Sequence, residues 1–420
     1  MITQSAVTIV TVVPSENESR LQQLLESAGE DPAGNAILPF AQFPNVHFAR
    51  FFILPASADR NGRSFSSRLV FLADVDGAAD AFVRQLVAAA GDGLHAIYQH
   101  CAEYPGRSGL LHYLQHNSVP AAATYVNTVG RTVQQVHQEA QLHDGIEAFL
   151  DDHAAELSDV PPRIVRTRIQ EFVEREPSLH WALQPPPSPD VTYVLGEKLQ
   201  LAIVGAAGIL LFPAILAVAP LYLALLRWHE THDVAMDVVP DDALVQKLAA
   251  QEDHGVQNPF TSAGFLKPGV FRKLTGSVVL WGTNFVARHL FNHANLIGVK
   301  TIHFARWVFL DNKRRLFFAS NYDGSLENYM DDFIDKIAWG LNIVFSNGED
   351  YPETRFLVLD GAHTEQVFKR FNLTHQLVTP FWYAAYQGIT ALNIENNARI
   401  RAGLYGAMDD QATCAWLRRL

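Results

Sequence analysis

The tetrapeptide His-Phe-Ala-Arg occurs twice in this chain, at residues 47–50 and again at residues 303–306. Each copy lies in a strongly apolar stretch with alternating side chains, which is typical of a strand in a hairpin. Beyond the hairpins, residues 69–105 align without a gap to residues 316–352, at a constant offset of 247. A repeat of this length indicates a duplicated domain and not a solenoid of short units. The chain is therefore expected to fold as two related halves.

Both copies predict the same order of elements: strand, helix, strand, strand, helix, strand and one more helix. In the first copy, residues 6–13 read as the first strand and residues 18–29 as the first helix. This is the order of the ferredoxin-like, split βαβ arrangement, which leaves one face of its sheet without helices. That face needs a cover, and the sheet of the second copy is the natural one. We therefore predict an α+β fold in which duplicated ferredoxin-like domains form an intramolecular two-sheet α/β barrel, with an inserted hydrophobic helical hairpin.

The insertion lies between the two copies. We assign residues 1–150 to the first ferredoxin-like repeat, 151–250 to a helical linker and 251–420 to the second repeat. Within the linker, residues 201–226 carry no charge, and about 20 apolar residues suffice to cross a bilayer. A single crossing would put the halves on opposite sides of the membrane, where they could not form one barrel. We therefore predict a membrane-dipping hairpin that bends at Pro213. The alternative is a buried pair of helices between the domains.

The composition narrows the partners and the compartment. Hydrophobic residues make up 48% and charged residues 18%, which is apolar for a soluble protein and favours contact with membrane lipid. The net charge of -12 argues against nucleic acid as a partner. Two cysteines suit a reducing compartment, and the N-terminal segment lacks a basic leader, so it reads as a strand and not as a signal peptide. We expect a monotopic or peripheral protein on the cytoplasmic face of a membrane, with an apolar small-molecule substrate and the capacity to form a homo-oligomer.

Polar side chains on the repeated hairpin are the first candidate site. Alternation in the second copy places Arg306 opposite Ala319, with Asp323 on the same face, and the first copy repeats this face with Arg50 and Asp76. The face is expected to point between the two sheets, whereas His47 and His303 are expected on the helix-covered face. The aspartates would serve as acid or base and the arginines would stabilise negative charge. The alternative is structural, with the aspartates capping helices and the arginines bridging the sheets.

The motifs "ADVDG" at residues 73–77 and "SNYDG" at residues 320–324 follow the hairpin strands. With the duplicated architecture, they resemble the dimeric α/β-barrel superfamily, which includes dye-decolourising peroxidases and chlorite dismutases. In the peroxidases a Gly-x-x-Asp-Gly motif and an arginine lie on the distal side of haem; here Ala73 and Ser320 take the place of the first glycine. The resemblance implies a haem cofactor. The histidines we consider for binding it are His289, His303, His363 and His375.

A second cluster directly follows the apolar segment. His229, Glu230, His232 and Asp233 lie within five positions, and on a helix the pairs at i, i+3 and i, i+4 share a face that could hold a metal. The alternative is the polar end of an interfacial helix.

The sequence does not decide whether the chain is an enzyme. Motifs for nucleotide cofactors are absent, because there is no GxGxxG and no Walker loop. We favour a membrane-associated, haem-dependent, peroxidase-like oxidoreductase that acts on an apolar or lipid-like substrate. The alternatives are a non-catalytic barrel that binds a lipid or isoprenoid, and a metal-dependent enzyme that uses the cluster at residues 229–233.

Overall fold

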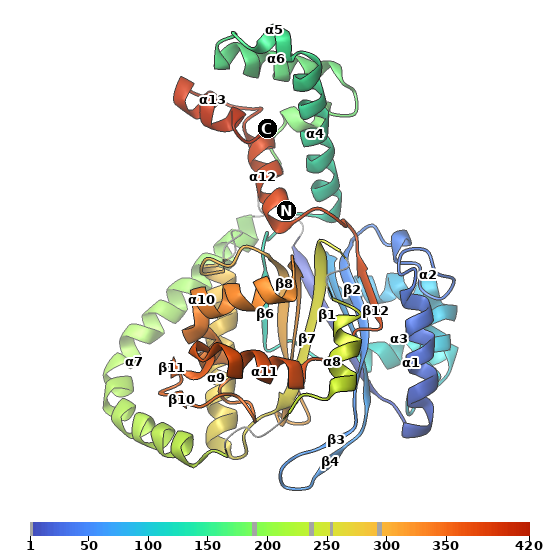
Figure 1. Ribbon diagram of the computed structural model, residues 1–420, viewed down its shortest axis with the longest axis vertical. Coiled ribbons are helices and arrows are strands. Elements are labelled where there is room, and N and C mark those ends of the chain that lie inside the picture. The colour runs from blue at the N-terminus through green and yellow to red at the C-terminus, as the bar shows by residue number, and fades with distance from the viewer. Residues whose placement is uncertain (1–2, 187–190, 235–238, 253–254, 292–295) are drawn as a thin grey trace.

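Two four-stranded antiparallel sheets form the centre of the computed structural model (Figure 1). The structure describes residues 3–186, 191–234, 239–252, 255–291 and 296–420. The first sheet has the order β1-β5-β2-β12, with β1 at Gln4–Val12, β2 at Val46–Leu54, β5 at Arg68–Asp76 and β12 at Phe381–Ala384. The second has the order β6-β8-β9-β7, with β6 at Ala123–Val126, β7 at Gln257–Phe265, β8 at Ile302–Leu310 and β9 at Arg315–Asp323. The predicted α+β class is confirmed, although the described strands do not close into one barrel.

The two halves of the chain exchange one strand each. β6 belongs to the first half but pairs with β8 of the second, and β12 belongs to the second half but pairs with β2 of the first. On the way to its partner, each exchanged segment makes a single bridge to the other sheet, through Ser118 to Ile9 and through Gln376 to Ser262. Neither sheet is therefore made by one half alone.

Both central hairpins carry the same irregularity. The register shifts between Val46 and Phe48 in β2, and between Ile302 and Phe304 in β8. Such a β-bulge adds one residue to a strand and re-aims its side chain. The extra residues are His47 and His303, which turn into the space between the sheets. Their predicted place on the helix-covered face is therefore wrong, because simple alternation does not continue through a bulge.

Helices cover the outer face of each sheet (Figure 1). The first sheet carries α1 (Ser15–Gly29), α2 (Ala79–Tyr98) and α3 (Leu110–His116). The second carries α9 (Val270–His289), α10 (Leu326–Phe345) and α11 (Glu365–His375). α2 and α10 lose helical geometry at matching positions, Ala90 and Ile337. Two short ribbons flank the sheets: β3 (Ser57–Ala58) with β4 (Ser64–Phe65), and β10 (Thr354–Arg355) with β11 (Leu359–Asp360).

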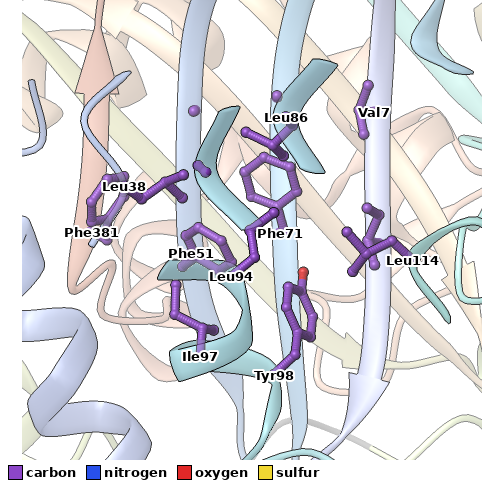
Figure 2. Close-up of a cluster of buried hydrophobic side chains, with 14 of the residues drawn as sticks. Val7, Leu38, Phe51, Phe71, Leu86, Leu94, Ile97, Tyr98, Leu114 and Phe381 are labelled. Carbon is purple, nitrogen blue, oxygen red and sulfur yellow. The ribbon is translucent and has the colours of Figure 1, made fainter. Parts of the chain in front are cut away.

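The core of the first half is closely filled. Figure 2 shows Leu86, Leu94 and Ile97 of α2 lying over Phe51 and Phe71 of the sheet. These five side chains are at most 1% exposed. Such packing leaves no room for a ligand on this side of the first sheet.

A helical extension stands apart from the sheets (Figure 1). It contains α4 (Val133–Asp152), α5 (Ala154–Leu157), α6 (Pro162–Arg175), α12 (Ala391–Ala402) and α13 (Asp410–Leu417). α4 follows β6 and α12 follows β12, so both exchanged strands lead into it. Its own small core includes Ile146, Ile169, Ile400 and Trp416. The extension therefore fastens the two halves together a second time.

The apolar segment is part of one helix, α7 (Val191–His232), which curves around the outside of α9 and is followed by α8 (Asp242–Ala249) (Figure 1). The predicted hairpin is wrong, because Pro213 and Pro220 both lie inside this helix. A proline removes one backbone hydrogen bond and kinks a helix, but reversing the chain needs a turn, and apolar helix formers surround Pro213. By length and composition, α7 is the one helix among the described residues that could cross a membrane.

Candidate functional site

Arg306 reaches from the second sheet across to the first. Its guanidinium donates hydrogen bonds to the Val7 carbonyl (2.5 Å), the Thr8 hydroxyl (3.2 Å) and the Ala73 carbonyl (3.0 Å), and it forms an ion pair with Asp74. The arginine is only 2% exposed. A buried guanidinium needs this many acceptors, because it has lost its water.

Arg50 makes the matching contacts from the first sheet across to the second. It donates to the Phe260 carbonyl (2.9 Å), the Thr261 hydroxyl (3.0 Å) and the side-chain oxygen of Asn321. Burial lowers the pKa of Arg50 to about 9, and the charge of Asp74 opposes this shift only in part. The hollow between the two arginines has a volume of about 10 Å³, which is room for about one water. The arginines thus bridge the sheets, and no substrate-sized space adjoins them.

The aspartates of the repeated motif hold helices. Asp323 lies 2.7 Å from Nε2 of His303 and accepts a hydrogen bond of 2.7 Å from the Ala391 amide at the start of α12. Asp76 repeats this, with His47 at 3.0 Å and the first amide of α4 at 2.9 Å. A carboxylate at a helix N-terminus accepts an amide that has no partner within the helix and complements the helix dipole. Both aspartates therefore have the geometry of helix anchors.

The four residues considered for a metal do not converge. Glu230 is buried and accepts hydrogen bonds from backbone amides beyond β10, while Asp233 forms an ion pair of 2.8 Å with Lys267. His229 and His232 stack on neighbouring aromatic rings. In the part of the chain that the structure describes, no three His, Cys, Asp or Glu side chains are grouped so as to hold a metal ion.

The four histidines considered for haem lie apart. His303 is paired with its aspartate, and His289 lies 3.1 Å from Glu197 of α7. His363 is exposed, and His375 donates to the backbone of its own helix. None of the four is among the described residues that line the two cavities of more than 500 Å³, so these residues do not fit an axial ligand for haem.

A large cavity lies elsewhere in the second half, between the second sheet and helices α9 and α10. Its volume is about 570 Å³. Aromatic and aliphatic side chains make up most of the lining, among them Phe260, Val286, Trp307, Phe318, Met330 and Phe333. No Asp, Glu, Lys, Arg, His or Cys is among the described residues that line it. The site can therefore hold an apolar molecule, and its described lining offers no charged group or strong acid or base for chemistry.

The first half differs from the second at the place that corresponds to this cavity. In the first half, Leu38 and Phe40 fill the corresponding space, and a Cβ on Gly93 would meet the Ile37 carbonyl at 1.5 Å. Gly340 is the counterpart of Gly93. Of the described residues outside its neighbours, only Ile337 comes within 4 Å of a Cβ there, at 3.8 Å. The first half is thus plugged by its own backbone at a place where no described residue of the second half fills the space.

The opening of the cavity is apolar. Val278, Leu290 and Trp339 line it and are also exposed on the surface, by 58%, 62% and 44%. Large apolar side chains around an opening are unusual in water and mark a binding surface. A ligand would therefore meet these apolar side chains as it enters.

α7 is attached beside this opening by its two ends. Near its start, Glu197 accepts a hydrogen bond of 2.7 Å from Arg288 at the end of α9. Near its end, His229 stacks on Phe271 at the start of α9, with ring centroids 4.7 Å apart. Between these two contacts α7 is about 48 Å long, whereas α9 is only about 26 Å long. α7 must therefore bow outward. In the strongly apolar part of that bow none of the residues is buried.

Sequence reasoning missed the cavity, because the loop that fills the first half, residues 37–40, lies outside the segments that align between the two copies. Comparison with known proteins gives no relative: no protein family, no curated protein and no solved structure matches this chain.

Proposed function

We propose that this protein is associated with a membrane and binds an apolar, lipid-like molecule in the cavity of its second half, without converting it. The single observation that carries the proposal is the cavity itself, which is large and apolar and has no charged side chain among the described residues that line it. The haem-dependent oxidoreductase has no comparable support, because its candidate residues hold helices and sheets together. Binding therefore explains the described geometry better than catalysis does.

The size of the cavity suits a lipid-like chain. Ligand pockets have volumes of about 300–1,000 Å³, and 570 Å³ lies in this range. At about 30 Å³ for each water-sized group, it has room for roughly 20 non-hydrogen atoms. Burial of such a ligand is favourable by about 25 cal/mol for each Å² of apolar surface removed from water.

The membrane part of the proposal rests on α7. Its most exposed side chains include Ile209 and Leu210, each 80% exposed, and no residue in its strongly apolar part is buried. Because α9 holds both ends on one body, we propose that the helix lies within one leaflet and does not cross the bilayer. α9 adds the exposed Val270, Leu274 and Trp281, so the opening of the cavity would face the lipid.

We also propose that the two halves are duplicated ferredoxin-like domains that exchange their fourth strands. Supporting this are the matching bulges in β2 and β8, the matching breaks in α2 and α10, and the matching contacts of the two arginines. The isolated β-bridges of Ser118 and Gln376 link the edges of the two sheets, so the two sheets together come close to the predicted barrel.

Binding of diphenylhexatriene tests the proposed function. This probe is a neutral hydrocarbon that fluoresces in an apolar environment. The full-length protein, purified in a detergent below its micelle concentration, is expected to bind one probe saturably and to release it to a competing alkane. Linear, non-saturable uptake would show that the cavity is not a ligand site.

A further inference from the structure

Two glycines line the cavity from the helices above it, Gly282 of α9 and Gly340 of α10. A glycine within a helix is less stable than an alanine, because it loses more backbone freedom on folding. A close approach of other atoms can require one. Among the described residues, however, a Cβ on Gly282 would meet nothing within 4 Å, and one on Gly340 would meet only Ile337, at an ordinary 3.8 Å. The packing that the structure describes therefore requires neither glycine.

The space beside both glycines belongs to the cavity. Residues three or four positions apart share one face of a helix. The neighbours of each glycine on its own face also line the cavity: Val278 and Val286 beside Gly282, and Ile337 and Val344 beside Gly340. Both glycines are partly exposed, so a molecule in the cavity can reach them.

The first half uses the same two positions for close packing. Gly29 matches Gly282, because each stands 25 residues after the first residue of its strand, Gln4 of β1 or Gln257 of β7. A Cβ on Gly29 would meet the Pro380 carbonyl at 2.0 Å, which is too close for any side chain. The counterpart of the α10 glycine is blocked by backbone in the same way. The first half thus needs its two glycines for its own backbone, whereas no described residue of the second half uses the space beside them.

We infer that Gly282 and Gly340 determine which apolar molecules the cavity accepts, and that the ligand is a methyl-branched hydrocarbon chain whose side groups enter the space a Cβ would fill. The inference rests on the proposed function and specifies its ligand. Each missing Cβ leaves room for about one methyl group. A straight chain leaves these spaces empty, and the atoms around an empty space lose contacts that a filled one provides. Of two isomeric chains, the branched one should therefore bind more tightly.

Displacement of diphenylhexatriene by nonadecane and by its methyl-branched isomer pristane tests this. The two alkanes have the same atoms and no polar group, so they differ only in shape. In the wild-type protein we expect pristane to displace the probe at least about fourfold better, which is the factor for burial of one methyl group. Equal displacement, or better displacement by nonadecane, overturns the inference and leaves the proposed function intact. This comparison does not depend on any variant.

The double variant Gly282→Ala with Gly340→Ala fills both spaces with a methyl group of the protein. It should bind nonadecane as well as the wild type does and lose the preference for pristane. Because alanine is the better helix former, its Tm should not fall. Gly205→Ala makes the same change in α7, away from the lining of the cavity, and should keep the preference.

A preference for pristane that survives in the double variant would contradict the role of the two glycines. A lower Tm of this variant would also contradict it, because packing would then require the glycines. Failure of diphenylhexatriene itself to bind to the wild-type protein is a different result, which removes the proposed function and this inference with it.

Discussion

Arg306 of the second sheet forms an ion pair with Asp74 of the first, whereas its counterpart Arg50 meets the neutral amide of Asn321. Two buried guanidiniums thus share one carboxylate, and Asn321 also donates to Asp74 at 3.3 Å. The asymmetry is small in sequence, an Asp against an Asn at matching positions. It leaves Arg50 paired with a neutral amide where Arg306 has a carboxylate.

Removing that carboxylate should destabilise the protein strongly. Asp74→Asn leaves two buried guanidiniums with no carboxylate in contact, and loss of one partner of a buried pair costs about 3–5 kcal/mol. We expect the free energy of unfolding, measured with urea, to fall by this amount. Asn321→Asp is the matched control: it gives Arg50 a carboxylate and should destabilise far less. Equal losses for the two variants would contradict the role of charge.

Asp323→Asn should loosen the helical extension. The variant keeps the shape but weakens the contacts to His303 and to the first amide of α12. Loss of a charged group at a helix N-terminus costs about 1–2 kcal/mol. We expect faster hydrogen exchange of the first amides of α12, with unchanged exchange in α1. Unchanged exchange in α12 would show that the carboxylate does not hold the helix.

Filling the cavity should abolish ligand binding without unfolding the protein. Gly282 of α9 lines the cavity, and a Cβ there meets nothing within 4 Å. Gly282→Phe should therefore weaken diphenylhexatriene binding at least about tenfold, because the ring takes up ligand volume. Gly205→Phe in α7, where a Cβ also meets open space, is the control and should bind as the wild type does. Equal binding by both variants would place the probe elsewhere.

Charges on α7 should release the protein from membranes. Ile209→Glu with Leu210→Glu changes two side chains that are each 80% exposed, so the fold should tolerate both. A carboxylate in lipid costs about 2 kcal/mol or more, so co-sedimentation with liposomes should fall more than tenfold. Ile164→Glu, on the exposed surface of α6, is the control. Unchanged sedimentation of the double variant would rule out α7 as the membrane contact.

Acid should destabilise the protein partly through His375. Burial lowers the pKa of this side chain, although the Phe371 carbonyl and Asp350 oppose the shift. The unfolded chain then takes up the proton at a higher pH than the native protein, so the free energy of unfolding falls as the pH drops below about 6.5. His375→Gln should flatten this fall between pH 7 and pH 5 in urea unfolding. His363→Gln, at an exposed position, should leave the pH dependence of the free energy of unfolding unchanged. The same pH dependence in the wild type and in both variants would contradict the role of His375.

Local patterns predicted the hairpins well. A short turn fixes the register, and Arg306 does pair with Ala319 as alternation requires. The bulges were not predictable, because nothing in His-Phe-Ala-Arg distinguishes a regular strand from one with an extra residue. The exchange of β6 and β12 was also hidden, since strand partners far apart in sequence depend on which sheet edges lie nearby. The cavity depends on where one loop packs, which the repeat alignment does not contain.

The exchanged strands have a consequence for the order in which the chain is made. β2 leaves the ribosome more than 300 residues before β12, its partner, and β6 waits for β8. An unpaired strand edge is a template for pairing with other chains. The apolar α7 emerges between these strands, while both sheets are still incomplete. A half-made chain therefore exposes open strand edges and an apolar helix at the same time.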